Sequence, residues 1–313
     1  MDFTVFSTQN SRYLAEKICA RLGKLASLKN IERWQFDDGE QYYRLDIEKS
    51  DALMGKDVIF VGSTHTDDDL LELYRVGCGL AEHGTRRRIF IIPFFGYSTM
   101  ERAVKPGEIV TAKKNAHLLS AIPNTGLGNI FLFLDLHTPG LVHYFEGNCL
   151  RYEVNSEPIL VEAIKELNLS EMIFASADLG RPRRVKSFAD LFETDIALIS
   201  KTRQQKDTFI DNVIGNVKGK TVIIYDDMTR SGGTIAKAAE AYMNQGASQI
   251  YAVLSHLAPS NKEAIEKLAQ MPVVKIISTN SHPATQSPGI LNSEKFIIKD
   301  VSGIFAQAIK QLG

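Results

Sequence analysis

The feature that most constrains the fold is a series of short apolar runs, each followed by a polar or glycine-rich stretch. These runs cover residues 57–63, 88–95, 129–137, 171–178, 195–200, 221–227, 249–256 and 273–279. They are rich in Ile, Val and Phe and do not alternate with polar residues, as expected for parallel strands covered on both faces. Amphipathic stretches lie between them, including 68–82, 157–167 and 235–245. The alternation predicts an α/β fold with doubly wound parallel sheets.

The length of 313 residues is enough for two domains of ordinary size. The strand-and-helix pattern occurs twice, and proline, glycine and asparagine residues interrupt it at 138–150. The sequence therefore predicts two similar α/β domains, an N-terminal one at residues 1–146 and a C-terminal one at residues 147–313.

Composition narrows the classes of partner. The net charge of −1 gives no overall field that would attract nucleic acid or an anionic membrane. There is no uncharged apolar run of the roughly 18 residues that a membrane helix needs, and the first residues lack the features of a signal peptide. Cys19, Cys78 and Cys149 have no metal-ligand spacing and favour thiols in a reducing cytoplasm. We expect a cytoplasmic protein that acts on small molecules, with any phosphate site built locally.

Two acidic residues at a strand end begin the most informative segment. Asp226 and Asp227 follow the apolar run 221–225, at the carboxyl end where open α/β sheets bind ligands. A loop with two glycines comes next, and a helix is expected from about residue 235. The glycines let backbone N–H groups turn inward, and the helix amino terminus adds partial positive charge, so the loop suits a phosphate. The acids suit sugar hydroxyls or a divalent cation. An ordinary strand–loop–helix joint is the alternative.

The whole string resembles the ribose-phosphate-binding loop of phosphoribosyltransferase folds, and within them most of all that of the ribose-phosphate pyrophosphokinases. Those loops read approximately Asp-Asp-Met-x-Asp-Thr-Gly-Gly-Thr. The resemblance implies two domains of phosphoribosyltransferase type, the first on the ATP side and the second holding the acceptor. The residues that it assigns to the ribose-phosphate acceptor are Asp226, Asp227, Thr229, Arg230, Ser231, Gly232, Gly233 and Thr234.

A second motif lies at residues 36–40, after a segment that we expect to be helical. It resembles the family's Phe-x-Asp-Gly-Glu, which reads the adenine of ATP. The resemblance implies that Phe36 stacks on the base and that Asp38 and Glu40 bind its edge. An aromatic ring with directed acceptors is a sensible adenine reader. Taken alone, the motif is equally compatible with a capped turn.

Further strand ends resemble the family's metal and catalytic motifs. His137 ends a Leu-Asp-Leu-His string, and Asp178 stands in a Ser-Ala-Asp-Leu-Gly string. The resemblance makes both of them ligands of Mg²⁺, with ATP as co-substrate. Lys201 and Arg203 resemble the Lys-x-Arg of the family's mobile catalytic loop, which stabilises charge on the transferring group. Without the resemblance, a structural histidine and two solvated cations would be the ordinary interpretation.

The chain departs from the family on the ATP side. Thr99 and Met100 stand where the family has the Arg and Gln that contact ATP. A charge-assisted contact of that kind contributes about 1.5–3 kcal/mol. Its loss predicts weaker ATP binding unless another cation, such as Arg102 or Lys105, replaces it.

The chain also departs from the family on the acceptor side. Arg181 replaces a glycine in the Asp178 loop, and Arg230 replaces an aspartate in the phosphate loop. Arginine binds phosphate oxygens in pairs. Two added guanidinium groups favour an acceptor with more phosphate than ribose 5-phosphate.

The resulting hypothesis is a diphosphotransferase that moves the β,γ-diphosphate of ATP to the anomeric hydroxyl of a 5-phosphorylated ribose and releases AMP. ADP-ribose is the preferred acceptor, as in a phage branch of the family that rebuilds NAD through ADP-ribose 1-pyrophosphate. Ribose 5-phosphate is the alternative. A non-catalytic regulatory paralogue and a plain phosphoribosyltransferase are further alternatives. The resemblance also implies a homo-oligomer, a dimer or a hexamer, in which residues 36–40 reach a neighbour's ATP site.

Overall fold

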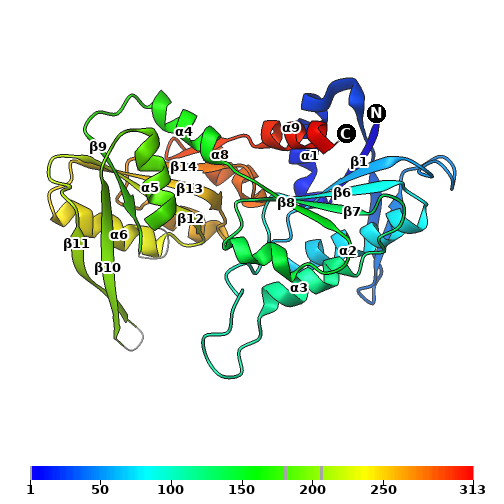
Figure 1. The fold of residues 1–313 in the computed structure, drawn as a ribbon, viewed down its shortest axis with the longest axis horizontal. Helices are drawn as coiled ribbons and strands as arrows, with labels where there is room; N and C mark the ends of the chain where they lie inside the picture. The colour runs from blue at the N-terminus through cyan, green and yellow to red at the C-terminus, as the bar shows by residue number, and fades with distance from the viewer. Residues whose placement is uncertain (1, 179–181, 205–206, 313) are drawn as a thin grey trace. The chain divides into compact units, whose positions relative to one another are not determined.

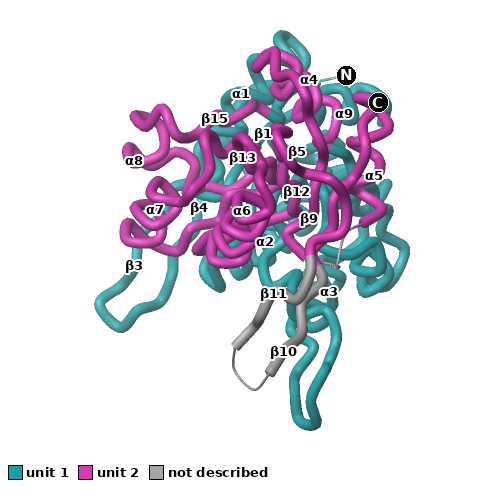
Figure 2. The backbone as a smooth tube through the Cα atoms, turned by 90° about the vertical axis from the view of Figure 1, so that its left-hand side faces the viewer, with its two compact units in different colours: residues 1–155, 301–313 teal, residues 156–300 magenta. Residues whose placement is uncertain are grey.

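Two β-sheets organise the chain in the computed structural model, which describes residues 2–178, 182–204 and 207–312. The side chains of residues 200–212 lie outside this description. The chain divides into two compact units (Figure 2). Unit 1 comprises residues 1–155 and 301–313, and unit 2 comprises residues 156–300.

Unit 1 is built on a six-stranded parallel sheet in the order β2-β1-β5-β6-β7-β8. Its strands are β1 (Phe3–Ser7), β2 (Ala26–Leu28), β5 (Asp57–Val61), β6 (Arg87–Ile92), β7 (Asn129–Leu134) and β8 (Leu150–Val154). Its helices are α1 (Arg12–Leu22), α2 (Asp67–Glu82), α3 (Thr111–Ser120) and α9 (Ser302–Leu312), with 3₁₀ turns at Gln9–Ser11, Gly23–Leu25 and Pro139–Tyr144. Every residue of β1, β5, β6 and β7 is buried, because helices cover both faces of the sheet.

The helices of unit 1 lie in two layers. α2 and α3 bury their apolar sides against Phe60, Phe90 and Phe131 on one face of the sheet. α1 and α9 pack against each other on the opposite face (Figure 1). α2 begins at a capped end, where Thr66 Oγ1 accepts from the Asp69 N–H at 3.1 Å.

A β-hairpin stands apart from the six-stranded sheet. Its strands, β3 (Ile31–Gln35) and β4 (Gln41–Leu45), pair antiparallel and form a sheet of their own. The turn is closed by the Phe36 N–H, which donates to Glu40 O at 2.9 Å, and Gly39 has a positive φ of 94°. The expected helix before residue 36 is therefore wrong. The segment is extended because its aromatic side chains pair across the two strands.

Unit 2 carries a seven-stranded sheet in the order β11-β10-β9-β12-β13-β14-β15, with only β10 and β11 antiparallel. Its strands are β9 (Met172–Ser176), β10 (Ile196–Gln204), β11 (Asp207–Ile214), β12 (Thr221–Thr229), β13 (Gln249–Leu257), β14 (Ile276–Thr279) and β15 (Phe296–Lys299). Its helices are α4 (Glu157–Glu166), α5 (Pro182–Leu191), α6 (Gly233–Asn244), α7 (Lys262–Ala269) and α8 (Pro288–Leu291), with a 3₁₀ turn at Pro283–Gln286. α6 and α7 cover one face of the sheet, and α4 and α5 cover the other.

The predicted fold class is confirmed, and the two units are similar in topology. In unit 1, β1 lies between β2, the next strand in the sequence, and the later strand β5. In unit 2, β9 lies in the same way between β10 and the later strand β12. The predicted strand runs correspond to β5, β6, β7, β9, β10, β12, β13 and β14. The compact units differ from the predicted domains, since β8 completes the sheet of unit 1 after residue 146 and α9 packs on unit 1. Within the described ranges, no helix is both long enough and apolar enough to span a membrane.

A buried ion-pair cluster ties β5 to the start of β6. Asp57 is 3% exposed and accepts from Arg86 at 2.8 and 2.7 Å and from Arg87 at 2.6 Å. Burial opposes ionisation of Asp57, but the two guanidinium groups outweigh it and hold the pKa of this carboxyl below its ordinary value.

We predict that Asp57→Asn lowers the free energy of unfolding by about 2–3 kcal/mol at pH 7, because two cations lose their charged partner. A carboxyl whose pKa is lower in the folded protein than in the unfolded chain stabilises the fold at pH values above its unfolded-state pKa. That contribution is lost as the pH falls through its folded-state pKa. The difference in the free energy of unfolding between wild type and Asp57→Asn should therefore stay constant from pH 7 to pH 5 and become smaller below about pH 4. Urea denaturation at each pH measures this. Asp195→Asn, which changes an exposed pair with Lys220, is the control that should alter little.

Candidate active site

The segment between β12 and α6 has the geometry of an anion-binding loop. Gly232 occupies the helix N-cap with a left-handed φ of 77°, and its N–H donates to Thr229 Oγ1 at 3.0 Å. A Cβ at Gly232 would lie 2.2 Å from Met271 Sδ, so the backbone can turn here only without a side chain. Glycine offers no capping group, and the first N–H groups of α6 have no intrahelical partner. Such N–H groups are suited to binding an anion, and the exposed Ser231 and Thr234 lie beside them.

The acidic pair lies within β12 itself, which runs to Thr229 and is longer than the predicted run. Asp226 is half-buried and Asp227 is 5% exposed. Successive strand residues project from opposite faces, so the two carboxylates leave β12 on different sides. Asp226 Oδ1 accepts from the Asp227 N–H at 2.9 Å, which orients the first carboxylate. The sheet thus presents two differently directed acids next to the amino terminus of α6.

Strand pairing brings Asp178 to the same edge. β9 and β12 are parallel neighbours, with Ser176 opposite Tyr225. Asp178 follows Ser176 by two residues, and Asp226 and Asp227 follow Tyr225 by one and two. This edge is a topological switch point, because β9 lies between β10 on one side and β12 on the other. Ligands of open α/β sheets bind at such points.

The predicted catalytic residues lie on an arm that extends from the neighbouring strand. β10 pairs with β9 only at Ile196 and Ala197, and it continues as an antiparallel ribbon with β11. Lys201 and Arg203 belong to this ribbon, with their backbones opposite Ile210 and Thr208. The side chains of Lys201 and Arg203, and the whole of Arg181, lie outside the described residues.

The predicted ATP-side residues of unit 1 follow its central strands. Thr99, Met100 and Arg102 come after β6, and His137 comes after β7, its parallel neighbour. These residues therefore belong to the carboxyl edge of one sheet. Thr99 and His137 are half-buried, and Met100 is exposed. The Arg102 side chain is exposed, with its Nε 3.5 Å from Glu101 Oε1.

Tyr97 anchors the loop that carries Thr99 and Met100, a role that sequence reasoning missed. Its φ is 58°, and its hydroxyl donates to Asp67 Oδ1 at 2.8 Å, in the first turn of α2. That hydrogen bond raises the pKa of the Tyr97 phenol. No local pattern links residues that are thirty positions apart, so the contact had no sequence signal.

Phe36, Asp38 and Glu40 occupy the hairpin turn. Asp38 Oδ1 accepts from the Glu40 N–H at 3.1 Å, so this carboxylate shapes the turn. All three residues are exposed, and Phe36 is 48% exposed. The turn therefore presents a ring and two carboxylates to the solvent together.

The two predicted metal ligands belong to different units, His137 to unit 1 and Asp178 to unit 2. Over the described part of the chain, no three His, Cys, Asp or Glu residues gather into a metal cluster. Mg²⁺ commonly binds through one or two carboxylates, while water and substrate phosphates supply the other ligands. The carboxylate of Asp178 fits that preference better than the imidazole of His137 does.

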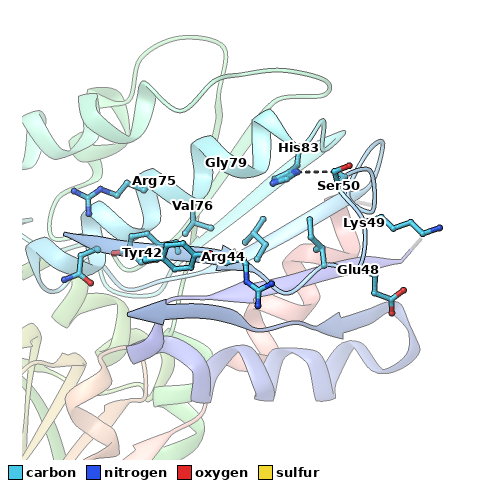
Figure 3. A pocket seen from close by; sticks show the side chains of 13 residues that line it. Tyr42, Arg44, Glu48, Lys49, Ser50, Arg75, Val76, Gly79 and His83 are labelled. Atoms are coloured by element: carbon cyan, nitrogen blue, oxygen red, sulfur yellow. Dashed lines mark hydrogen bonds between the residues drawn. The ribbon is translucent and has the colours of Figure 1, made fainter. Parts of the chain in front are cut away.

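Unit 1 also contains a groove of about 670 Å³ between β4 and α2 (Figure 3). Tyr43, Arg75 and His83 are among the side chains that line it, and His83 Nδ1 lies 3.3 Å from Ser50 O. Among the described residues that line this groove, none is a predicted site residue. The groove is therefore distinct from the strand-end residues of unit 1 described above.

Comparison with known proteins decides the family. The family described as the N-terminal domain of ribose phosphate pyrophosphokinase matches residues 3–122, and the phosphoribosyl synthetase-associated domain matches residues 181–313. A ribose-phosphate pyrophosphokinase of Porphyromonas gingivalis is 31% identical over 99% of this chain and 95% of its own length. The chain belongs to the ribose-phosphate pyrophosphokinase family. The predicted resemblance and the predicted transferase class are thereby confirmed.

Other relatives agree with this assignment. Ribose-phosphate pyrophosphokinases of Shewanella oneidensis and Gloeobacter violaceus are 31% and 32% identical, over 99% and 89% of this chain and 96% and 81% of their own lengths. The crystal structure of phosphoribosylpyrophosphate synthetase from Mycobacterium smegmatis superposes with a TM-score of 0.86 over 100% of this chain and 99% of that chain, at 24% identity. This likeness shows that the two proteins share a fold.

We predict that Gly232→Ala lowers the free energy of unfolding by about 1–3 kcal/mol, because alanine is strained at a left-handed φ and its methyl group meets Met271. Gly233→Ala is the matched control. Its Cβ would meet nothing closer than Ser231 Oγ at 3.8 Å, so stability should be nearly unchanged. Urea denaturation of both variants measures the difference. Equal stability of the two would contradict the strained N-cap.

Proposed function

We propose that the chain transfers the β,γ-diphosphate of ATP to the anomeric hydroxyl of ribose 5-phosphate and releases AMP. The hydroxyl oxygen attacks the β-phosphorus, the bond from that phosphorus to the α-phosphate oxygen breaks, and the hydroxyl proton leaves to solvent. The observation that carries the proposal is the Asp226–Asp227 pair beside the open amino terminus of α6, at the switch point of unit 2. Membership of the pyrophosphokinase family supports it.

The acceptor roles follow from the chemistry of this edge. The first-turn N–H groups of α6, with Ser231 and Thr234, bind the 5-phosphate. Carboxylates repel a phosphate but accept hydrogen bonds from hydroxyls, so Asp226 and Asp227 hold the ribose 2- and 3-hydroxyls. One site therefore separates the charged end of the sugar phosphate from its neutral ring. This separation fixes the direction in which the anomeric carbon points.

The donor roles rest on the family resemblance. Phe36, Asp38 and Glu40 read the adenine, and the loop with Thr99, Met100 and Arg102 faces the triphosphate. Lys201 and Arg203 stabilise the charge that develops on the transferring group. Asp178 and His137 would hold Mg²⁺, which when bound neutralises and orients the phosphates. The three cysteines are free thiols, in keeping with the cytoplasm as the proposed compartment.

The acceptor favoured in the sequence analysis, ADP-ribose, is now the second candidate. The relatives are named ribose-phosphate pyrophosphokinases, which favours ribose 5-phosphate for this chain. Arg230 is the observation that keeps ADP-ribose in consideration, because it is an exposed cation next to the phosphate loop. A second phosphate on the acceptor would bind more tightly with such a cation beside it.

We predict that the purified protein with Mg²⁺ and ATP forms AMP at least about tenfold faster with ribose 5-phosphate than with ADP-ribose, a difference of about 1.4 kcal/mol in transition-state stabilisation. Chromatography of AMP measures both rates, and chelation of Mg²⁺ is the control that should stop them. Equal or faster reaction with ADP-ribose would overturn the choice of acceptor. The absence of AMP with either acceptor would overturn the enzymatic proposal.

Arg230→Asp sharpens the same experiment, because it restores the residue that the family has in this loop. If ribose 5-phosphate is the acceptor and Arg230 contacts no second phosphate, the substitution should change the rates with both acceptors by similar factors. A selective loss of ADP-ribose use would instead assign Arg230 to a second acceptor phosphate.

We further propose that the chain works as a homo-oligomer in which the hairpin turn serves a neighbour's ATP site, as the family resemblance implies. Phe36→Ala and Lys201→Ala then damage different parts of one shared site. Co-expression of the two variants should restore activity to about a quarter of wild type, the fraction expected when dimers form at random with isologous sites. Each variant expressed alone is the control, assayed at low ATP. Failure of the mixed protein to exceed both variants would contradict a shared site.

A further inference from the structure

The hairpin of unit 1 has an anchored face and an aromatic face. Side chains alternate along a strand, so Arg33 and Trp34 point in opposite directions. Arg33 donates to Glu72 Oε1 of α2 at 2.9 Å and to Ser7 O of β1 at 2.5 Å, and its cross-strand partner Tyr43 packs on the core. This face fastens the hairpin to the rest of unit 1.

The opposite face carries three aromatic rings in direct contact. Trp34 and Tyr42 are cross-strand partners, and their rings stack with centroids 3.5 Å apart and planes 13° apart. The Phe36 ring is nearly perpendicular to both, at 6.0 Å and 76° from Trp34 and at 6.4 Å and 85° from Tyr42. Edge-to-face contacts of this kind are favourable beyond the area that they bury.

The cluster is open to solvent. Trp34 is 41% exposed and Phe36 is 48% exposed. Phe36 begins the turn, and its contacts with the rings of Trp34 and Tyr42 restrict its orientation. Phe36 is 48% exposed, so part of the ring stays open for stacking. A ring that is already oriented loses less side-chain freedom when a ligand binds.

We propose that Trp34, supported by Tyr42, is a positioning residue that holds the Phe36 ring ready to stack on the nucleobase of the diphosphate donor. This inference rests on the proposed function, in which Phe36 reads adenine. Trp34 acts through Phe36, so its effect falls on binding of the base and leaves the triphosphate contacts unchanged. Because Arg33 anchors the opposite face, the hairpin stays attached when Trp34 is removed.

Steady-state kinetics test the proposal with two substitutions. Trp34→Ala should raise KM for ATP about 5-fold, the effect of losing edge-to-face and stacking contacts of ordinary strength, with kcat within about twofold. Trp34→Phe keeps a ring at the position and should restore most of the affinity. Inorganic tripolyphosphate, which has no base, should inhibit wild type and Trp34→Ala with equal inhibition constants. Tyr152→Ala removes a 44%-exposed ring from β8 and is the matched control.

Fluorescence gives a readout that does not need turnover, because Trp34 is the only tryptophan in the sequence. AMP should change the emission of the wild-type protein and leave that of Phe36→Ala unchanged. If wild type turns over ATP but AMP leaves Trp34 emission unchanged, the proposal is overturned. If Trp34→Ala raised KM for ATP and the inhibition constant of tripolyphosphate by the same factor, the positioning proposal would also be overturned, because the role of Trp34 would then be structural only. If AMP changes the emission but no acceptor yields AMP from ATP, the proposed reaction fails while the positioning role stands.

Discussion

Parallel pairing of β9 with β12 is the constraint on which the proposed acceptor site depends. The pairing sets Ser176 beside Tyr225, so the residues that follow each strand emerge at one edge. A shift of one residue in this pairing would exchange the faces from which Asp226 and Asp227 project and would displace them relative to Asp178. The burial of both strands on both faces holds this register. The chemistry of the site is therefore a consequence of apolar packing several residues away.

The phosphate loop shows how opposite charges can share a small volume. Carboxylates at a strand end raise the electrostatic cost of binding an anion, and the positive end of a helix lowers it. The two effects act at different places, because Gly232 turns the chain between them with a left-handed backbone. Thr229 supports that turn by accepting the Gly232 N–H. A substrate that is neutral at one end and doubly charged at the other matches this division.

The sequence predicted the central strands well, because fully buried strands leave continuous apolar runs. It predicted that Asp226 and Asp227 follow an apolar strand, and the family resemblance pointed to Asp178, which the structure places after the neighbouring strand β9. The ligands of these three residues stay a prediction. It did not predict the hairpin β3–β4, because the contact between Trp34 and Tyr42 forms only when the two strands pair. The Tyr97 hydrogen bond was equally hidden, as it joins segments far apart in the chain. Periodicity reports what each segment buries, and it does not report which distant segment lies opposite.

The C-terminal helix has a consequence for how the protein is made. α9 packs with α1 on unit 1, although the whole of unit 2 lies between them in the sequence. Unit 2 is thus an insertion, and all of its strands are synthesised before the last helix of unit 1. During translation the part of the N-terminal sheet that α9 covers stays exposed until α9 has been synthesised. Such a chain is exposed to aggregation longest in the half that was made first.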